Sequence, residues 1–158
     1  MALVVGTNAY VDADTADTYF GDRLNASKWS GATADEKDQA LVTATLRLDQ
    51  LTFKGVRTDS SQPLAWPRWG VKDEDGYLLD SDTVPDRSKR ATMELALSLL
   101  NAGTTDSLAD TGLEGFDSVK VGPITVDVRH RKQSLPDHVR REVAPLLRTN
   151  GGFEMVRG

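Results

Sequence analysis

The sequence contains no cysteine, which excludes disulfide bonds and cysteine-based zinc sites. Two histidines, His130 and His138, are the remaining soft metal ligands, and arginine and lysine residues lie close to both in the sequence. Such surroundings repel a cation and supply few carboxylate ligands. We therefore expect both histidines to be surface residues, and we expect the protein to hold no metal ion and no cofactor.

Long apolar runs are also missing, because none approaches the ~20 residues that a membrane-spanning helix needs. The first seven residues have neither the basic region nor the long apolar stretch of a signal peptide. These absences predict a soluble protein that is made in the cytoplasm and has no membrane partner.

Recognisable catalytic patterns are absent as well. There is no Gly-x-Ser-x-Gly nucleophile motif and no glycine pattern that cradles a phosphate before a helix. The acidic run Asp73-Glu74-Asp75-Gly76 fails as a calcium loop, because Val71 would occupy the first ligand position and Asp82 would replace the final glutamate. We interpret this run as a solvated turn in which Gly76 supplies a positive φ angle. We expect the protein not to be an enzyme.

The charge of the chain is unevenly distributed. Its net charge is −5, with 11 basic and 19 acidic side chains in residues 1–116 and 8 basic and 5 acidic side chains in residues 117–158. An acidic total argues against a general nucleic-acid-binding protein, whose affinity comes mostly from clustered lysine and arginine. The difference between the two parts predicts that they meet different surroundings.

Two helices are expected in the first third of the chain. Asp12 is an N-cap candidate for a helix to about Arg23. The predicted inner face of this helix consists of Ala13, Ala16, Tyr19, Phe20 and Leu24. Thr33 and Glu36 form a capping box for a helix to about Leu51. The spacing places Leu41, Ala44, Leu48 and Leu51 on its inner stripe and leaves Lys37, Asp38, Arg47 and Asp49 to solvent.

Two further helices follow a long loop. Residues 52–83 are rich in Gly, Pro, Asp and Ser, yet they include Trp66 and Trp69, so we expect this loop to be held against the helices. Val84-Pro85 begins the central helix, which Gly103 ends. A last helix is expected from about Pro136 to Arg148, kinked by Pro145 and with Val139, Val143, Leu146 and Leu147 inward.

Residues 119–128 alternate with the two-residue period of strands around a Gly122-Pro123 turn, which predicts a short hairpin. The sequence therefore predicts a mainly α fold, a small bundle of about four helices with a short β-hairpin. A chain of 158 residues suits one core, so we expect a single helical domain at residues 1–148. An extended, flexible C-terminal tail is expected at residues 149–158.

Two basic clusters are the plausible nucleic-acid contacts: residues 129–132 and the pair Arg140-Arg141. The His130 ring lies within the first cluster, where a base can stack on it. Most such clusters are instead solvated faces or protein contacts, so single-stranded-DNA binding is kept as the alternative function.

A family resemblance becomes specific at Trp66-Pro67-Arg68. The residues that carry it are Tyr10-Val11-Asp12, Ala16-Asp17-Thr18-Tyr19-Phe20, Trp29, Lys37, Ala40-Leu41, Ala44-Thr45, Leu48-Asp49, Phe53-Lys54-Gly55, Arg57, Gln62, Leu64 to Arg68, Val84-Pro85, Ala91, Glu94-Leu95-Ala96 and Lys120-Val121-Gly122. In this pattern, over residues 4–148, the chain resembles the small head-tail adaptor (connector) proteins of tailed phages and prophages. Members of that group are often labelled putative DnaT-like single-stranded-DNA-binding proteins.

The resemblance implies a structural virion protein at the head-tail interface, or neck. Such an adaptor is mostly helical and monomeric when free, and it forms a ring of twelve on the portal after DNA packaging, continuing the channel through which the genome leaves. The implied partners are the portal protein, neighbouring adaptor subunits, a tail terminator or stopper protein, and genomic DNA that passes without sequence-specific binding.

The resemblance also implies roles for particular residues. The C-terminal helix and tail of such adaptors commonly reach the portal, which corresponds here to residues 136–158. The residues implied as portal-binding are the arginines Arg140, Arg141 and Arg148, as charge partners, and Phe153 and Met155, as apolar anchors. In the loop, Trp66 is expected to be buried, Pro67 to stiffen the chain, and Arg68 to bridge backbone carbonyls or a carboxylate.

Overall fold

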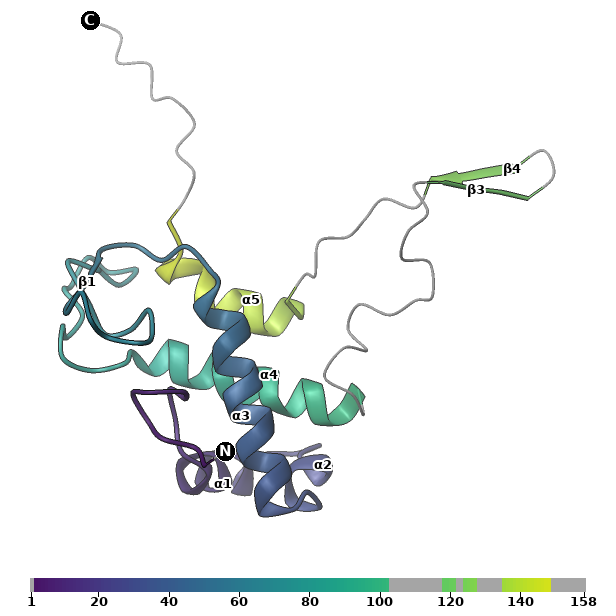
Figure 1. The fold of residues 1–158 in the computed structure, drawn as a ribbon, viewed down its shortest axis with the longest axis horizontal. Coiled ribbons are helices and arrows are strands. Elements are labelled where there is room, and N and C mark those ends of the chain that lie inside the picture. The colour runs from purple at the N-terminus through teal and green to yellow at the C-terminus, as the bar shows by residue number, and fades with distance from the viewer. Residues whose placement is uncertain (1, 103–117, 122–123, 128–134, 149–158) are drawn as a thin grey trace, which may run out of the picture.

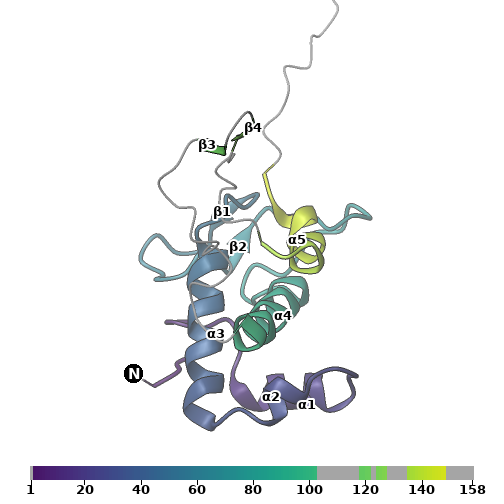
Figure 2. The ribbon, with the colours of Figure 1, turned by 90° about the vertical axis from the view of Figure 1, so that its right-hand side faces the viewer.

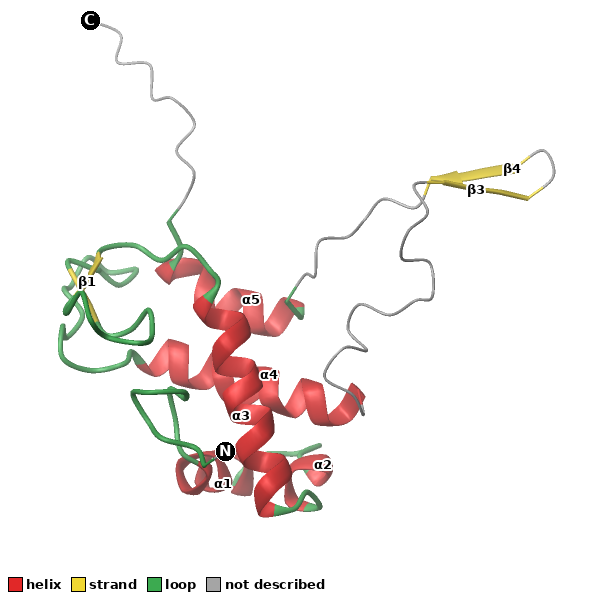
Figure 3. Ribbon diagram, viewed as in Figure 1, coloured by secondary structure: helices red, strands yellow, loops and turns green. Residues whose placement is uncertain are grey.

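Helices form the body of the protein, as the sequence predicts (Figures 1 and 3). The computed structural model describes residues 2–102, 118–121, 124–127 and 135–148. Its helices are α1 (Ala13–Gly21), α2 (Ser27–Ser30), α3 (Ala34–Asp49), α4 (Asp86–Ala102) and α5 (Asp137–Val143), followed by a 3-10 turn, η1 (Ala144–Leu146). None of the helices in these described ranges combines the length and the hydrophobicity needed to cross a membrane. The mainly α fold class is confirmed.

Two antiparallel strand pairs accompany the helices. β1 (Val56–Arg57) pairs with β2 (Arg68–Trp69) inside the long loop. β3 (Ser118–Val121) pairs with β4 (Ile124–Asp127), which confirms the predicted hairpin. Gly122-Pro123, the expected turn of this hairpin, and residues 149–158, the expected tail, lie outside the described residues.

Helix α4 is the centre of the packing. It contacts α2, α3 and α5, while α5 and the α1–α2 pair lie on opposite sides of it (Figures 1 and 2). Ala91, Leu95 and Ala96 on α4 are fully buried. Small alanine side chains at such positions let neighbouring helices approach closely. The predicted central helix is therefore confirmed, although Pro85 lies just before its first residue, where the Pro85 carbonyl accepts a hydrogen bond from Lys89 N.

The predicted start signals of α1 and α3 are both present. The Asp12 side chain accepts a hydrogen bond from Thr15 N at 2.6 Å. At α3, the Thr33 hydroxyl accepts from Glu36 N, and the Glu36 carboxylate accepts from Thr33 N at 2.8 Å. Each cap satisfies backbone N–H groups that have no partner within the helix.

The prediction that Leu24 lies on the inner face of the first helix is wrong. The helix ends at Gly21, so Leu24 lies beyond it and is 93% exposed. The chain turns there, because Arg23 N donates to the Phe20 carbonyl and Asn25 has a φ of 65°. Helical spacing no longer decides where a side chain points once the helix has ended.

Helix α2 was not expected from the sequence. Its four residues place Trp29 in the core, 2% exposed, beside the Phe20 ring at a centroid distance of 5.0 Å. The indole N–H of Trp29 donates to the Asp17 carboxylate at 2.7 Å. A four-residue helix is too short for a periodic pattern, and tertiary packing of Trp29 stabilises it.

The last helix is shorter than predicted. Helix α5 ends at Val143, and the chain continues as the 3-10 turn η1, which contains Pro145. Proline has no N–H for a helical hydrogen bond, so it ends the α-helix here and does not kink a longer one. Val139, Val143 and Leu146 are buried as predicted, whereas Leu147 is only partly buried.

Candidate functional site

The arginines expected at the portal lie on the surface near α5. Arg140 and Arg141 are exposed on the helix, and Arg148 is exposed just after η1. The Arg148 backbone N–H donates to the Thr52 carbonyl at 2.9 Å, which ties this end of the chain to the long loop. Phe153, Met155, His130 and the basic cluster at 129–132 lie outside the described residues.

Ion pairs hold α5 against α4. Glu142 on α5 accepts from the Arg90 guanidinium at 3.2 Å, and Arg87 lies 3.9 Å from the same carboxylate. Arg87 also pairs with Glu74 in the long loop at 2.6 Å. These partly exposed pairs add to the apolar packing of the buried side of α5 and fix the helix while its arginines point outward.

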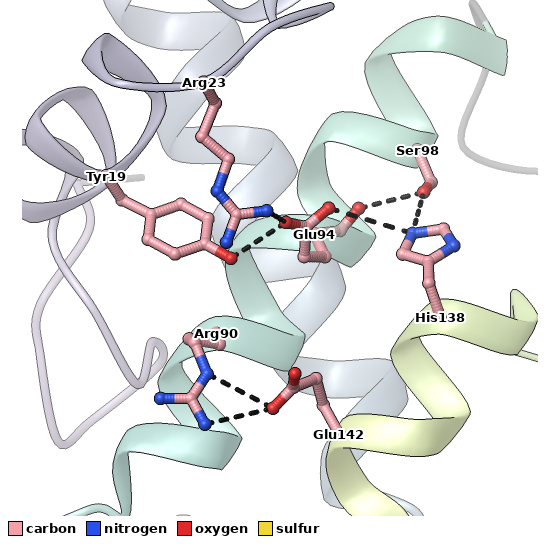
Figure 4. A network of polar contacts seen from close by, with 7 residues as sticks. All are labelled: Tyr19, Arg23, Arg90, Glu94, Ser98, His138 and Glu142. Atoms are coloured by element: carbon pink, nitrogen blue, oxygen red, sulfur yellow. Dashed lines mark hydrogen bonds and ion pairs between the residues drawn. The ribbon is translucent and has the colours of Figure 1, made fainter.

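Glu94 on α4 connects three helices (Figure 4). Its carboxylate accepts from the Tyr19 hydroxyl at 2.8 Å and from Arg23 at 2.7 Å, both from the α1 region. His138 on α5 lies 3.9 Å away on the other side. The Arg23 guanidinium also lies 4.2 Å from the centroid of the Tyr19 ring. No local pattern in the sequence indicates this cluster, because its members come from positions far apart in the chain.

The Glu94 cluster changes the acidity of Tyr19. Burial, followed by the hydrogen bond to the Glu94 carboxylate, raises the pKa of Tyr19 to about 12. In the unfolded chain the pKa of tyrosine is about 10. Between pH 10 and pH 12, Tyr19 therefore loses its hydroxyl proton more readily in the unfolded chain than in the folded protein. Stability that is fully present below pH 10 is therefore expected to fall as the pH rises toward 12. Denaturant unfolding across this range checks the prediction.

Tyr19→Phe is the matched variant for this prediction. It keeps the ring over Arg23 and removes the titrating hydroxyl, so its stability is expected to fall less steeply between pH 10 and 12. Equal alkaline slopes for the variant and the unchanged protein would contradict the assignment to Tyr19.

Ser98, His138 and Glu94 resemble a catalytic triad in composition but not in geometry (Figure 4). Both Ser98 Oγ, at 3.3 Å, and the Glu94 carboxylate, at 3.9 Å, approach the same His138 nitrogen, Nε2. A triad needs the acid on one ring nitrogen and the nucleophile on the other. The Ser98 hydroxyl also donates to the Glu94 backbone carbonyl at 2.9 Å. This arrangement positions α5 and does not activate a nucleophile.

The long loop is fixed by the Trp66-Pro67-Arg68 segment. Trp66 is 1% exposed and packs against Phe53, and the Trp66–Pro67 peptide bond is cis. Arg68 donates to the carbonyls of Lys54, Ala65 and Gly55 at 2.7, 3.2 and 2.8 Å. Burial, then the nearby Arg57, lowers the pKa of Arg68. The guanidinium therefore joins both sides of the loop through backbone oxygens.

Asp49 provides a second anchor for the loop, although the sequence assigned it to solvent. Its carboxylate accepts from Ala65 N at 2.7 Å and from the Tyr10 hydroxyl. Burial, followed by the hydrogen bond to Asp49, raises the pKa of Tyr10. The expectation for Asp49 was wrong because the loop folds back over the end of α3, a contact that helical spacing does not reveal.

The long loop also exposes an apolar surface. Val56 and Trp69 are directly opposite each other in the β1–β2 pair and are 65% and 69% exposed. Trp66 holds the loop against the body of the protein, as the sequence predicts, whereas Trp69 is mainly exposed. Directly paired residues share one face of a ribbon, so we call this surface the Val56–Trp69 face.

A groove lies at the start of α4. Its volume is about 360 Å³, and we call it the α4 groove. Its apolar lining includes Leu79, Val84 and Leu146, and its charged lining includes Asp80 and Asp86.

The acidic run after β2 forms a turn. Asp75 N and Tyr77 N both donate to the Asp73 side chain, at 3.0 and 2.8 Å, and Gly76 has a φ of +89°. The carboxylate of Asp73 is thus occupied by its own backbone. Within the described residues, no group of three or more His, Cys, Asp or Glu side chains is arranged to hold a metal ion.

Comparison with known protein families gives a match over nearly the whole chain. The family model described as "Putative DnaT-like ssDNA binding protein" matches residues 2–158. No curated protein and no solved structure matches the chain. The family match covers nearly the whole sequence, including the loop, the Glu94 cluster and α5.

Proposed function

The chain belongs to the family of putative DnaT-like ssDNA-binding proteins, and we propose that this member is a structural, non-enzymatic head-tail adaptor of a tailed-phage virion. In this role it forms a ring, of twelve copies by resemblance, between the portal and the tail. The ring continues the DNA channel and also contacts a tail terminator or stopper protein. In the virion, the protein is located at the head-tail interface, or neck.

The observation that carries this proposal is the way α5 is presented. Val139 and Val143 are fully buried, and ion pairs to α4 fix the helix, yet Arg140 and Arg141 remain exposed. A firmly held helix with outward arginines suits docking on a partner, because the backbone that carries the arginines is already ordered before binding. Arg148, which follows η1, is exposed as well.

Two further features support the proposal. The acidic excess of residues 1–116 suits a channel wall, because negative charge repels phosphate and lets DNA slide without sticking. Residues of the adaptor resemblance, such as Tyr10, Trp29 and Trp66, are buried and carry the fold.

Electron microscopy of the virion neck tests the proposal. We expect a ring of this chain between portal and tail, with α5 toward the portal. The double variant Arg140→Glu, Arg141→Glu reverses two charges and is expected to weaken docking on the portal by about tenfold or more. A tenfold loss of affinity corresponds to about 1.4 kcal/mol. Lys28→Glu, on the exposed side of α2, is the control and should dock normally. Placement of the chain elsewhere in the particle would end the proposal.

Single-stranded-DNA binding is the second candidate function, and the description of the family favours it. It predicts salt-sensitive binding to an oligonucleotide, with a logarithmic slope of about −0.7 per phosphate contact. Removing Arg140 and Arg141 by alanine substitution should then reduce the slope by about 1.4. An absence of binding at low salt would remove this candidate.

A further inference from the structure

The start of the long loop pairs with the residues that follow the last helical turn (Figure 1). Phe53 and Leu147 lie opposite each other in an antiparallel bridge. Two backbone hydrogen bonds of 2.9 Å flank the bridge. On one side, Lys54 N donates to the Leu146 carbonyl, and on the other, Arg148 N donates to the carbonyl of the residue before Phe53. The chain therefore leaves η1 as an extended segment that is bound to the loop.

Lys54 also binds the end of η1 through its side chain. Its ammonium group donates to the Pro145 carbonyl at 2.8 Å, next to the Leu146 carbonyl that its backbone N–H holds. Both carbonyls belong to η1, at the point where the helical segment ends. The last carbonyl groups of a helical segment have no partner within it, and a nearby lysine can satisfy them. Lys54 thus caps the end of the last helical segment.

The backbone carbonyl of Lys54 connects this cap to the Trp66-Pro67-Arg68 segment. It accepts a hydrogen bond from Arg68 Nε at 2.7 Å. Phe53, the residue before Lys54, packs against the buried Trp66 ring. Lys54 therefore uses its N–H, its carbonyl and its ammonium group to join the fixed part of the long loop to the end of the last helical segment.

This junction divides the residues that the proposed function uses. Arg140 and Arg141 precede it on α5, and Arg148 follows it directly. Residues 149–158, which include the implied apolar anchors, come next in the sequence. Free rotation at the junction would let the two groups move independently, and docking both on one partner would then carry an entropic cost. The contacts of Lys54 restrict that rotation.

We propose that Lys54 is a positioning residue for docking on the portal. It fixes the place and direction in which the chain leaves η1, and so it holds Arg148 relative to Arg140 and Arg141. The inference rests on the proposed adaptor function and adds a residue of the long loop to it. The Trp66-Pro67-Arg68 segment then contributes to docking as well, because Arg68 holds the Lys54 carbonyl.

Distances between spin labels test the positioning. Lys54→Met keeps the aliphatic part of the side chain and removes the ammonium donor, and the absence of cysteine allows labels on introduced cysteines alone. One labelled pair is Asp35→Cys, in the first turn of α3, with Arg148→Cys. The other pair is Asp35→Cys with Arg140→Cys. In Lys54→Met the first distance distribution should broaden. The second should stay unchanged, because apolar packing and ion pairs to α4 hold α5.

Docking is measured without labels, as binding of the full-length protein to purified portal rings. Lys54→Met is expected to weaken this binding about two- to tenfold, the usual effect of one hydrogen bond on an equilibrium. Lys72→Met is the matched control, since it removes a lysine from an exposed position of the same loop. It should bind normally and leave both distance distributions unchanged.

The possible outcomes separate this role from the adaptor function. A distribution between positions 35 and 148 that stays narrow in Lys54→Met would overturn the inference, and so would a broadened distribution with undiminished binding. An equal loss of binding from Lys72→Met would overturn it too, because the effect would then belong to charge. Each of these results leaves the adaptor function standing. If the unchanged protein does not bind portal rings, the adaptor function fails, and the docking role of Lys54 fails with it.

Discussion

Replacing Trp66 by alanine is expected to lower the free energy of unfolding by about 3–5 kcal/mol, the usual cost of removing a large aromatic side chain from a core. Trp66 is 1% exposed, and its ring lies 5.3 Å from that of Phe53. Its loss leaves a cavity beneath the long loop and removes the packing that brings Ala65 N to Asp49. Urea unfolding followed by circular dichroism measures the change.

Trp69→Ala is the matched control, three residues away in the same loop. Because Trp69 is 69% exposed, its removal is expected to change the free energy of unfolding by no more than about 0.5 kcal/mol. The two variants remove the same side chain, so their difference reports burial alone. Equal losses from both variants would mean that Trp69 is also a core residue in the free protein.

Local signals in the sequence predicted much of the helical framework. Asp12 and the Thr33–Glu36 capping box identify helix starts, because caps are made by residues within one turn. The apolar stretch through Ala91 and Leu95 identified the central helix, since only a helix surrounded by others is apolar on several sides.

Features that depend on contacts between distant residues could not be predicted in this way. Leu24 was assigned to a helical face because its spacing continued the pattern, but the helix had already ended. The β1–β2 pair has two residues in each strand, which is too short for an alternating pattern to be recognised. The loop was expected to be held against the helices because aromatic surface is costly to expose, but the sequence did not indicate that Trp66 is buried while Trp69, opposite Val56, is exposed.

The candidate site shows the same limit. Arg140 and Arg141 were identified from the sequence as a basic pair, and the structure places them on an exposed helix. The contacts that hold this helix in place could not be predicted, because they join residues far apart in the chain. Glu94 contacts Tyr19, which lies 75 residues before it, and His138, which lies 44 residues after it. The sequence thus indicated the basic pair, whereas the structure shows that both arginines are exposed and what holds their helix in place.

Gly55→Ala is expected to lower the free energy of unfolding by about 2–5 kcal/mol through two separate effects. The φ of Gly55 is +69°, a left-handed conformation that costs about 1–2 kcal/mol for other residues. A Cβ atom would also fall against the Trp69 carbonyl oxygen and lie 2.7 Å from Val71 Cγ2. Forcing an atom into such a contact typically costs a further 1–3 kcal/mol or so. Urea unfolding measures the sum.

Gly70→Ala separates the two effects. Gly70 also has a positive φ, +77°, but nothing lies within 4 Å of the position that its Cβ would take. Its replacement should therefore lower the free energy of unfolding only by the cost of the left-handed backbone conformation, about 1–2 kcal/mol. The excess for Gly55→Ala then measures how firmly β1 is held against β2. If the two substitutions lower the free energy of unfolding equally, β1 and β2 separate easily, and the Val56–Trp69 face is not held in a fixed shape.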